Sequence, residues 1–147
     1  MEQSGSRWRS SPVHITEFLR ALPAVGLALT PGLAHGLDLN SFRAQHGKPA
    51  LAYSATLAGV AQQQASSMAG RGRLDHANFK QRVAHLGTTA AENVSFGCDS
   101  QDCAIRQWAR SKGHRSNMLR GDVSAYGIAS AIGSNGRRYW ALALGGE

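Results

Sequence analysis

Hydrophobic residues recur at intervals of three and four along much of the chain after residue 36, which is the spacing of an amphipathic helix. The clearest case is residues 54–72, where Leu57, Val60 and Met68 mark one face and glutamines and serines fill the other. Ser54 is the predicted N-cap of this helix, because its side chain can accept a hydrogen bond from a free backbone N–H. Weaker patterns of the same kind predict further helices over residues 37–47, from residue 78, and over residues 100–113, where Gly113 is the predicted end.

Short apolar runs bounded by glycines predict strands over residues 90–97, 123–133 and 137–145. Asn135-Gly136, between the last two, is typical of a tight hairpin. The final run is apolar on both faces, so it belongs in the middle of a sheet that helices cover on both sides. The pattern therefore predicts an α+β fold, specifically a three-layer α/β/α sandwich with a small, mainly antiparallel sheet.

The beginning of the chain has a different composition. Arginines precede the apolar run 21–34, which ends with small residues at the −3 and −1 positions relative to a cut after Ala34. A basic region, a short apolar region and small residues at the cut are the parts of a secretory signal. The run is too short and too rich in proline and glycine to span a bilayer. We expect residues 1–36 to be a signal peptide, or an N-terminal tether if they are retained. Residues 37–147 would then form one secreted or periplasmic domain without a transmembrane span.

The chain is basic, with 16 Lys and Arg against 9 Asp and Glu and a formal net charge of +7. These charges are scattered, and no aromatic residues are interleaved with them as stacking platforms. The composition therefore argues against a specific nucleic-acid interface and favours a solvated basic surface, with adhesion to an anionic surface as an alternative. The sequence also lacks the GxSxG, Walker and HExxH motifs.

Cys98 and Cys103 are the two cysteines, in the spacing C-x4-C. Two thiolates are too few for a four-cysteine zinc site. Because export would place the domain in an oxidising compartment, we expect a disulfide between them. The loop that it closes is short, so its main effect would be on local geometry.

His76, Glu92 and His114 are the candidate functional residues. Each histidine lies in a polar segment beside an element end, and Glu92 interrupts an otherwise apolar strand. A buried carboxylate needs a partner, and behind an imidazole it fixes the tautomer of the ring. The two histidines could bind zinc or magnesium weakly, since no third ligand is evident. In the alternative, Glu92 bonds backbone groups in a loop and both histidines are ordinary surface residues.

Several pieces of the chain, in order, resemble the CAP superfamily of cysteine-rich secretory, antigen 5 and pathogenesis-related 1 proteins (the SCP domain), especially its short secreted bacterial members. They are LNSFRAQHGKPAL, LDHANFKQRV, AENVSFG, QWARSKGHRSNML and YGIASA with RRYWALALG. The resemblance implies an α/β/α sandwich with a cleft that holds two histidines and two glutamates. His76 and His114 match the histidines of the family, and Glu92 matches its first glutamate.

Ser111 stands where many members have the second glutamate, so the resemblance implies a binding module more than an enzyme. The expected cleft holds a divalent metal at His76 and His114 and a small apolar or envelope-derived ligand. Glu92 would orient an imidazole, and Asn93 and Ser111 would supply hydrogen bonds. The alternative is a metal-assisted hydrolase of peptides or glycans, with Glu92 as general base.

Overall fold

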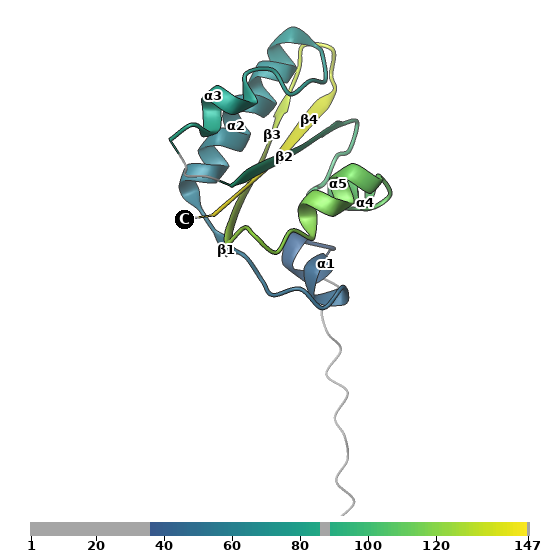
Figure 1. The fold of residues 1–147 in the computed structure, drawn as a ribbon. Coiled ribbons are helices and arrows are strands. Elements are labelled where there is room, and N and C mark those ends of the chain that lie inside the picture. Colours follow the sequence, from purple (N-terminus) through teal and green to yellow (C-terminus); the bar gives the residue numbers. More distant parts are fainter. Residues whose placement is uncertain (1–35, 86–88, 147) are drawn as a thin grey trace, which may run out of the picture. The chain divides into compact units, whose positions relative to one another are not determined.

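The fold is described from a computed structural model, which covers residues 36–85 and 89–146 (Figure 1). The predicted signal peptide or tether lies outside these residues, apart from Gly36. In chain order the elements are α1 (Leu39–Gln45), β1 (Ala52–Tyr53), α2 (Ala55–Arg71), α3 (Phe79–Val83), β2 (Ala90–Phe96), α4 (Gln101–Ala109), α5 (Lys112–Met118), β3 (Ala125–Ile132) and β4 (Arg138–Gly145). None of the helices in these ranges is long and apolar enough to cross a membrane.

The strands form one mixed sheet in the order β1-β3-β4-β2. The short β1 runs parallel to β3, whereas β4 is antiparallel to both of its neighbours. The strand that is apolar on both faces, β4, therefore lies inside the sheet, as its sequence predicted. β2 forms one edge (Figure 1).

Helices cover both faces of this sheet, which confirms the α+β sandwich (Figure 1). Tyr139, Ala141 and Ala143 of β4 pack on one face against the apolar stripe of α2. Trp140 and Leu142, which alternate with them, pack on the other face with α1, α4 and α5. Because successive side chains of a strand point to opposite faces, one strand contributes to both cores.

The helix α2 has the ends and the close packing that its sequence suggests. The Ser54 side chain accepts a hydrogen bond from the Leu57 N–H, and Gly72 ends the helix in the left-handed conformation. The helix lies directly on β3 at Gly127, where an added Cβ would be 2.0 Å from the backbone nitrogen of Ala58. The absence of a side chain at Gly127 therefore allows the backbone of α2 to pack directly on β3.

Two local predictions were wrong. The predicted helix over residues 100–113 ends at Ala109, and a new helix, α5, begins after Ser111. Ser111 breaks the run because it takes an extended conformation, with φ of −99° and ψ of 121°, whereas Gly113 is accommodated inside α5. His114 consequently lies on a helix and not in a loop. The segment between the helices predicted over residues 37–47 and 54–72, where no strand was predicted, contains β1, which pairs with β3.

A disulfide joins Cys98 to Cys103, as the spacing predicted. It links the end of β2 to the first turn of α4. The Trp140 indole N–H donates a hydrogen bond of 2.7 Å to the Cys98 carbonyl from the core below. The disulfide therefore holds α4 against the edge of the sheet where the candidate site lies.

Candidate functional site

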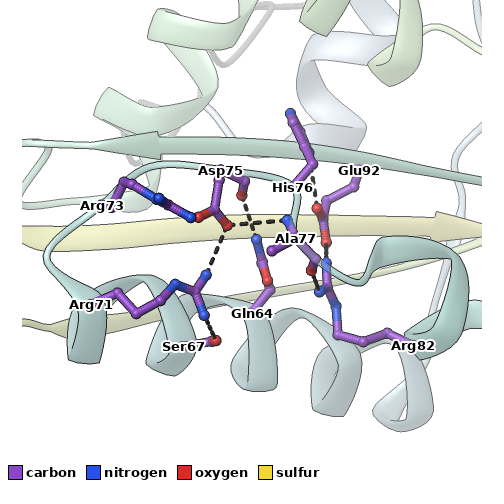
Figure 2. A network of polar contacts seen from close by, with 9 residues as sticks. All are labelled: Gln64, Ser67, Arg71, Arg73, Asp75, His76, Ala77, Arg82 and Glu92. Atoms are coloured by element: carbon purple, nitrogen blue, oxygen red, sulfur yellow. Dashed lines mark hydrogen bonds and ion pairs between the residues drawn. The ribbon is translucent and has the colours of Figure 1, made fainter.

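Glu92 projects from β2 with its side chain only 1% exposed. Its two carboxylate oxygens have different partners. Oε1 lies 2.9 Å from His76 Nδ1, and Oε2 lies 2.5 Å from Arg82 Nη2 (Figure 2). A buried carboxylate is costly unless it is paired, and here a guanidinium and an imidazole pair it. The contact between Glu92 and His76 is the one that the sequence suggested.

The loop that carries His76 is fixed to α2 by a polar network (Figure 2). Gln64 is fully buried on α2, and its amide donates to the Asp75 carbonyl. The Asp75 carboxylate accepts from Arg71, from Arg73 and from the Ala77 N–H. Burial by itself would raise the pKa of Asp75, but the Ala77 hydrogen bond and the two guanidinium groups lower it overall. The network therefore sets the position of His76 through its backbone.

Arg82 is a site residue that the sequence analysis missed. Its side chain is 7% exposed, and besides Glu92 it donates to the Ala77 carbonyl, which closes the loop onto α3. The guanidinium also lies over the Phe79 ring, 5.9 Å from the centroid. The available signal was Glu92 itself, because a carboxylate buried in a strand requires a cation, and Arg82 lies on a short helix just before that strand.

His114 is positioned by Asn93 and Asn117. The Asn93 side chain is fully buried, and its amide N–H donates to the His114 carbonyl at 2.9 Å. Its amide oxygen accepts from Asn117 Nδ2 at 3.0 Å. We expected Asn93 to bond a ligand, but the structure uses both ends of its amide to dock α5 onto β2. Asn93 is thus a positioning residue for His114.

The His114 imidazole favours its neutral form. Burial lowers the pKa of His114, and the nearby His76 lowers it further by electrostatic repulsion. A neutral imidazole is the form that binds a metal ion.

A pocket of about 210 Å³ lies beside His114. Its lining is mainly apolar and comes from β2, α4, the loop before α3 and the start of α5: Leu74, Val94, Ser95, Phe96, Gln107, Trp108, Ser111 and His114. Ser111 occupies the N-cap position of α5, but its side chain does not cap the helix. The hydroxyl is therefore left for the pocket.

His76 faces a different hollow, which it shares with residues of α3 and its approach: Asn78, Phe79, Lys80 and Gln81. Glu92 and Asn93 line neither of these two pockets, since both are buried. The structure thus brings the predicted residues into one neighbourhood without placing them around one cavity.

The donors for a metal ion are few. Within residues 36–85 and 89–146, no group of three or more His, Cys, Asp or Glu side chains is arranged to hold one. Glu92 occupies Nδ1 of His76, which leaves Nε2 of that ring as a donor. The arrangement of a carboxylate behind an imidazole fits a metal ligand. With His114 as the partner it would make an open site of low affinity.

Glu92 has the surroundings of an orienting residue. A general base must reach the proton that it removes, directly or through one water. The Glu92 carboxylate is buried, and His76 and Arg82 occupy its two oxygens. We therefore do not base a proposal on Glu92 as a base for hydrolysis.

Three solved structures of bacterial proteins have a similar fold. An outer surface protein from Borrelia burgdorferi matches with a TM-score of 0.66 and 16% identity over 74% of this chain and 86% of that one. An extracellular protein with an SCP domain from Bacillus anthracis matches with a TM-score of 0.62 and 21% identity over 74% of this chain and 38% of that one. A cysteine-rich secretory protein from Staphylococcus aureus matches with a TM-score of 0.58 and 22% identity over 72% of this chain and 35% of that one.

These identities show a shared fold. The chain spans well under half of the second and third structures. No curated protein matches the sequence significantly. The model of the cysteine-rich secretory protein family, called CAP, matches residues 38–144, which include most of the residues that the structure describes. The chain therefore belongs to the cysteine-rich secretory protein (CAP) family.

Proposed function

We propose that this chain is a secreted binding domain whose pocket beside His114 takes a small apolar group of a ligand from the medium or the cell envelope. The observation that carries the proposal is the pocket, which has apolar walls from Leu74, Phe96 and Trp108 and a polar edge from Ser111 and His114. Binding sites for small molecules combine apolar walls with a few polar groups that fix orientation.

The volume of the pocket limits what it can hold. Pockets for drug-sized ligands have roughly 300–1,000 Å³, and this one has about 210 Å³. It therefore suits a short alkyl or aromatic group, either alone or as one part of a larger ligand. His114 and the Ser111 hydroxyl would bond a polar atom next to that group.

We propose further that His76 and His114 hold a divalent metal ion weakly. Imidazole nitrogen suits zinc better than magnesium, which prefers oxygen ligands. Glu92 keeps His76 in the orientation that leaves Nε2 free, and burial lowers the pKa of His114, which favours the neutral ring. A bound ion would supply a positive centre for a carbonyl or anionic group of the ligand.

Secretion or periplasmic location is part of the proposal. The Cys98–Cys103 disulfide supports it, because such bonds persist in oxidising compartments. The similar structures from Bacillus anthracis and Staphylococcus aureus are of proteins described as extracellular or secretory, which agrees with it.

Titration with cis-parinaric acid, a fluorescent fatty acid, tests the pocket. We expect saturable binding to the wild type and a loss of about tenfold in Leu74→Asp, because a charge would replace part of the apolar wall. Leu74 is 40% exposed, so the substitution should leave the fold intact. Equal binding by both proteins would contradict the proposal.

Calorimetric titration with zinc tests the metal site. We expect His114→Ala to weaken zinc binding. The control is His46→Ala, because His46 lies at the end of α1 and bonds the Phe42 carbonyl. Equal zinc affinity in the wild type and in His114→Ala would refute the metal part of the proposal and leave the pocket standing.

A further inference from the structure

β2 has no neighbouring strand on its outer side, next to the pocket. Gly97 N–H bonds the Arg138 carbonyl, and Gly146 N–H bonds the Thr89 carbonyl, so odd-numbered residues of β2 pair with β4. In an antiparallel ladder the alternate residues then direct their N–H and C=O groups away from the partner strand. Those are the even-numbered residues, whose groups point to the open side of an edge strand.

Side-chain contacts agree with this direction. Asn117, on α5, donates its amide N–H to the carbonyl of Glu92 at 3.3 Å, which covers the edge at that position. Farther along the strand, the outward N–H and C=O of Val94 have no hydrogen-bond partner within the described part of the chain. Val94 is only 3% exposed, and buried backbone groups are nearly always paired. The described part of the chain therefore supplies no hydrogen-bond partner for the outward N–H and C=O of Val94.

The pocket surrounds this edge from both faces of the sheet. Val94 packs in the core beneath α2, whereas Ser95 faces the layer of α4 and α5. Both line the same pocket, between Leu74 on one side and Trp108 on the other. Because Val94, Ser95 and Phe96 follow one another along the edge strand and all line the pocket, we describe the pocket as a short groove at that edge.

The rim of the groove is apolar and basic. Leu74 and Phe96 are 40% and 39% exposed. The Arg137 guanidinium lies 5.3 Å from the centroid of the Phe96 ring, and Lys112 is exposed beside Ser111. Among the described ion pairs, neither cation has a carboxylate partner. The charge of the rim therefore complements an acidic ligand.

We propose that the groove binds an acidic peptide in extended conformation, which adds to β2 as a further strand. Its backbone pairs with Val94 and Phe96, one apolar side chain enters the pocket, and acidic side chains lie near Arg137 and Lys112. Main-chain hydrogen bonds supply affinity in strand addition, and pockets for alternate side chains supply specificity. The inference rests on the proposed function of this pocket and names the class of its ligand.

Selection of random nine-residue peptides on phage against the full-length protein tests the proposal. We expect enrichment of peptides with one apolar residue flanked by acidic ones. A synthetic copy of the best peptide is then N-methylated at one position at a time. Methylation should weaken binding about tenfold at alternate positions, because each inward-facing N–H that is lost removes one buried hydrogen bond. At the positions between, affinity should stay within about twofold, on the same reasoning.

Nuclear magnetic resonance supplies a second readout. On peptide binding, the Val94 and Phe96 amides should gain protection from hydrogen exchange, whereas Ser95 is already paired with β4. Leu74→Asp should reduce peptide affinity at least tenfold. The control is Ile132→Asp, an exposed apolar position in a different hollow, which should bind the peptide like the wild type.

The outcomes separate this inference from the proposed function. An absence of enriched peptides, or a flat N-methylation profile, would overturn strand addition. If cis-parinaric acid still bound in the pocket in that case, the ligand would be an apolar amphiphile and the proposed function would stand. If neither the peptides nor cis-parinaric acid bound, both would fall.

Discussion

Replacing Arg82 with methionine removes the guanidinium that lies 2.5 Å from Glu92 inside the domain. The two side chains are 7% and 1% exposed, so little solvent screens them. At an effective dielectric constant of about 20, two unit charges about 4 Å apart attract by about 4 kcal/mol. Breaking a buried pair from one side costs about 3–5 kcal/mol, because it leaves an uncompensated charge. We expect about 3 kcal/mol for Arg82→Met, since His76 still bonds the other oxygen of Glu92.

Glu92→Leu should lower the free energy of unfolding by a similar amount, because it leaves the buried charge of Arg82 without a partner. The double variant Arg82→Met/Glu92→Leu should be close to the wild type, since well-packed apolar residues can replace a buried ion pair at little cost. The coupling energy between the two sites, which is the cost of the double variant minus the summed costs of the two single variants, should therefore be about 6 kcal/mol in magnitude. Domains of this kind are stable by about 5–15 kcal/mol, so each single variant should still fold.

Urea unfolding followed by tryptophan fluorescence measures these free energies, because Trp108 and Trp140 are buried and report on the core. Arg106→Met is the matched control. Arg106 forms an exposed ion pair with Asp102 on α4, and its loss should leave the free energy of unfolding nearly unchanged. If the effects of Arg82→Met and Glu92→Leu added within about 0.5 kcal/mol, the buried pair would not be an energetic unit and the argument would fail.

Further predictions concern packing, pH and the disulfide. Gly127→Ala should destabilise the domain by several kcal/mol or prevent folding, because the added Cβ would meet the α2 backbone. Gly59→Ala, whose Cβ would have nothing within 4 Å, should stabilise α2 by about 0.5–1 kcal/mol. Thermal unfolding compares the two variants, and equal effects would contradict the close packing of α2 on Gly127. The pKa of His114 is lowered in the folded state, so the unfolded chain binds more protons between that pKa and about 6.5. Stability, measured with EDTA present, should therefore fall as the pH drops through this window, and His114→Gln should flatten the slope; an unchanged slope would refute the assignment. Replacing both Cys98 and Cys103 with serine should cost about 2 kcal/mol, the entropy of opening a loop of about six residues, and no change in melting temperature would show that the bond only fixes local geometry.

The sequence determined the elements whose signals are local. The apolar stripe of α2, its cap at Ser54 and the two apolar faces of β4 each follow from short-range periodicity, and the structure has them where the sequence placed them. The disulfide followed from two nearby cysteines. The predicted end of the helix over residues 100–113 was wrong, and the reason was not local. Ser111 takes an extended conformation, so one helix ends before it and α5 begins after it, with Gly113 inside α5. The packing of α5 on the core decides where this break falls.

The site depended on contacts between residues far apart in the chain. The sequence indicated that Glu92 needs a partner and offered His76, but Arg82 became its counter-ion only because α3 folds over β2. Asn93 looked like a ligand contact, yet packing of α5 turned its amide inward to the His114 carbonyl. The groove along β2 has no sequence signal, because it exists where Leu74, Val94 and Trp108 meet. Periodicity encodes which residues are buried, and only the tertiary structure decides which buried groups meet one another and which edge of the sheet stays open.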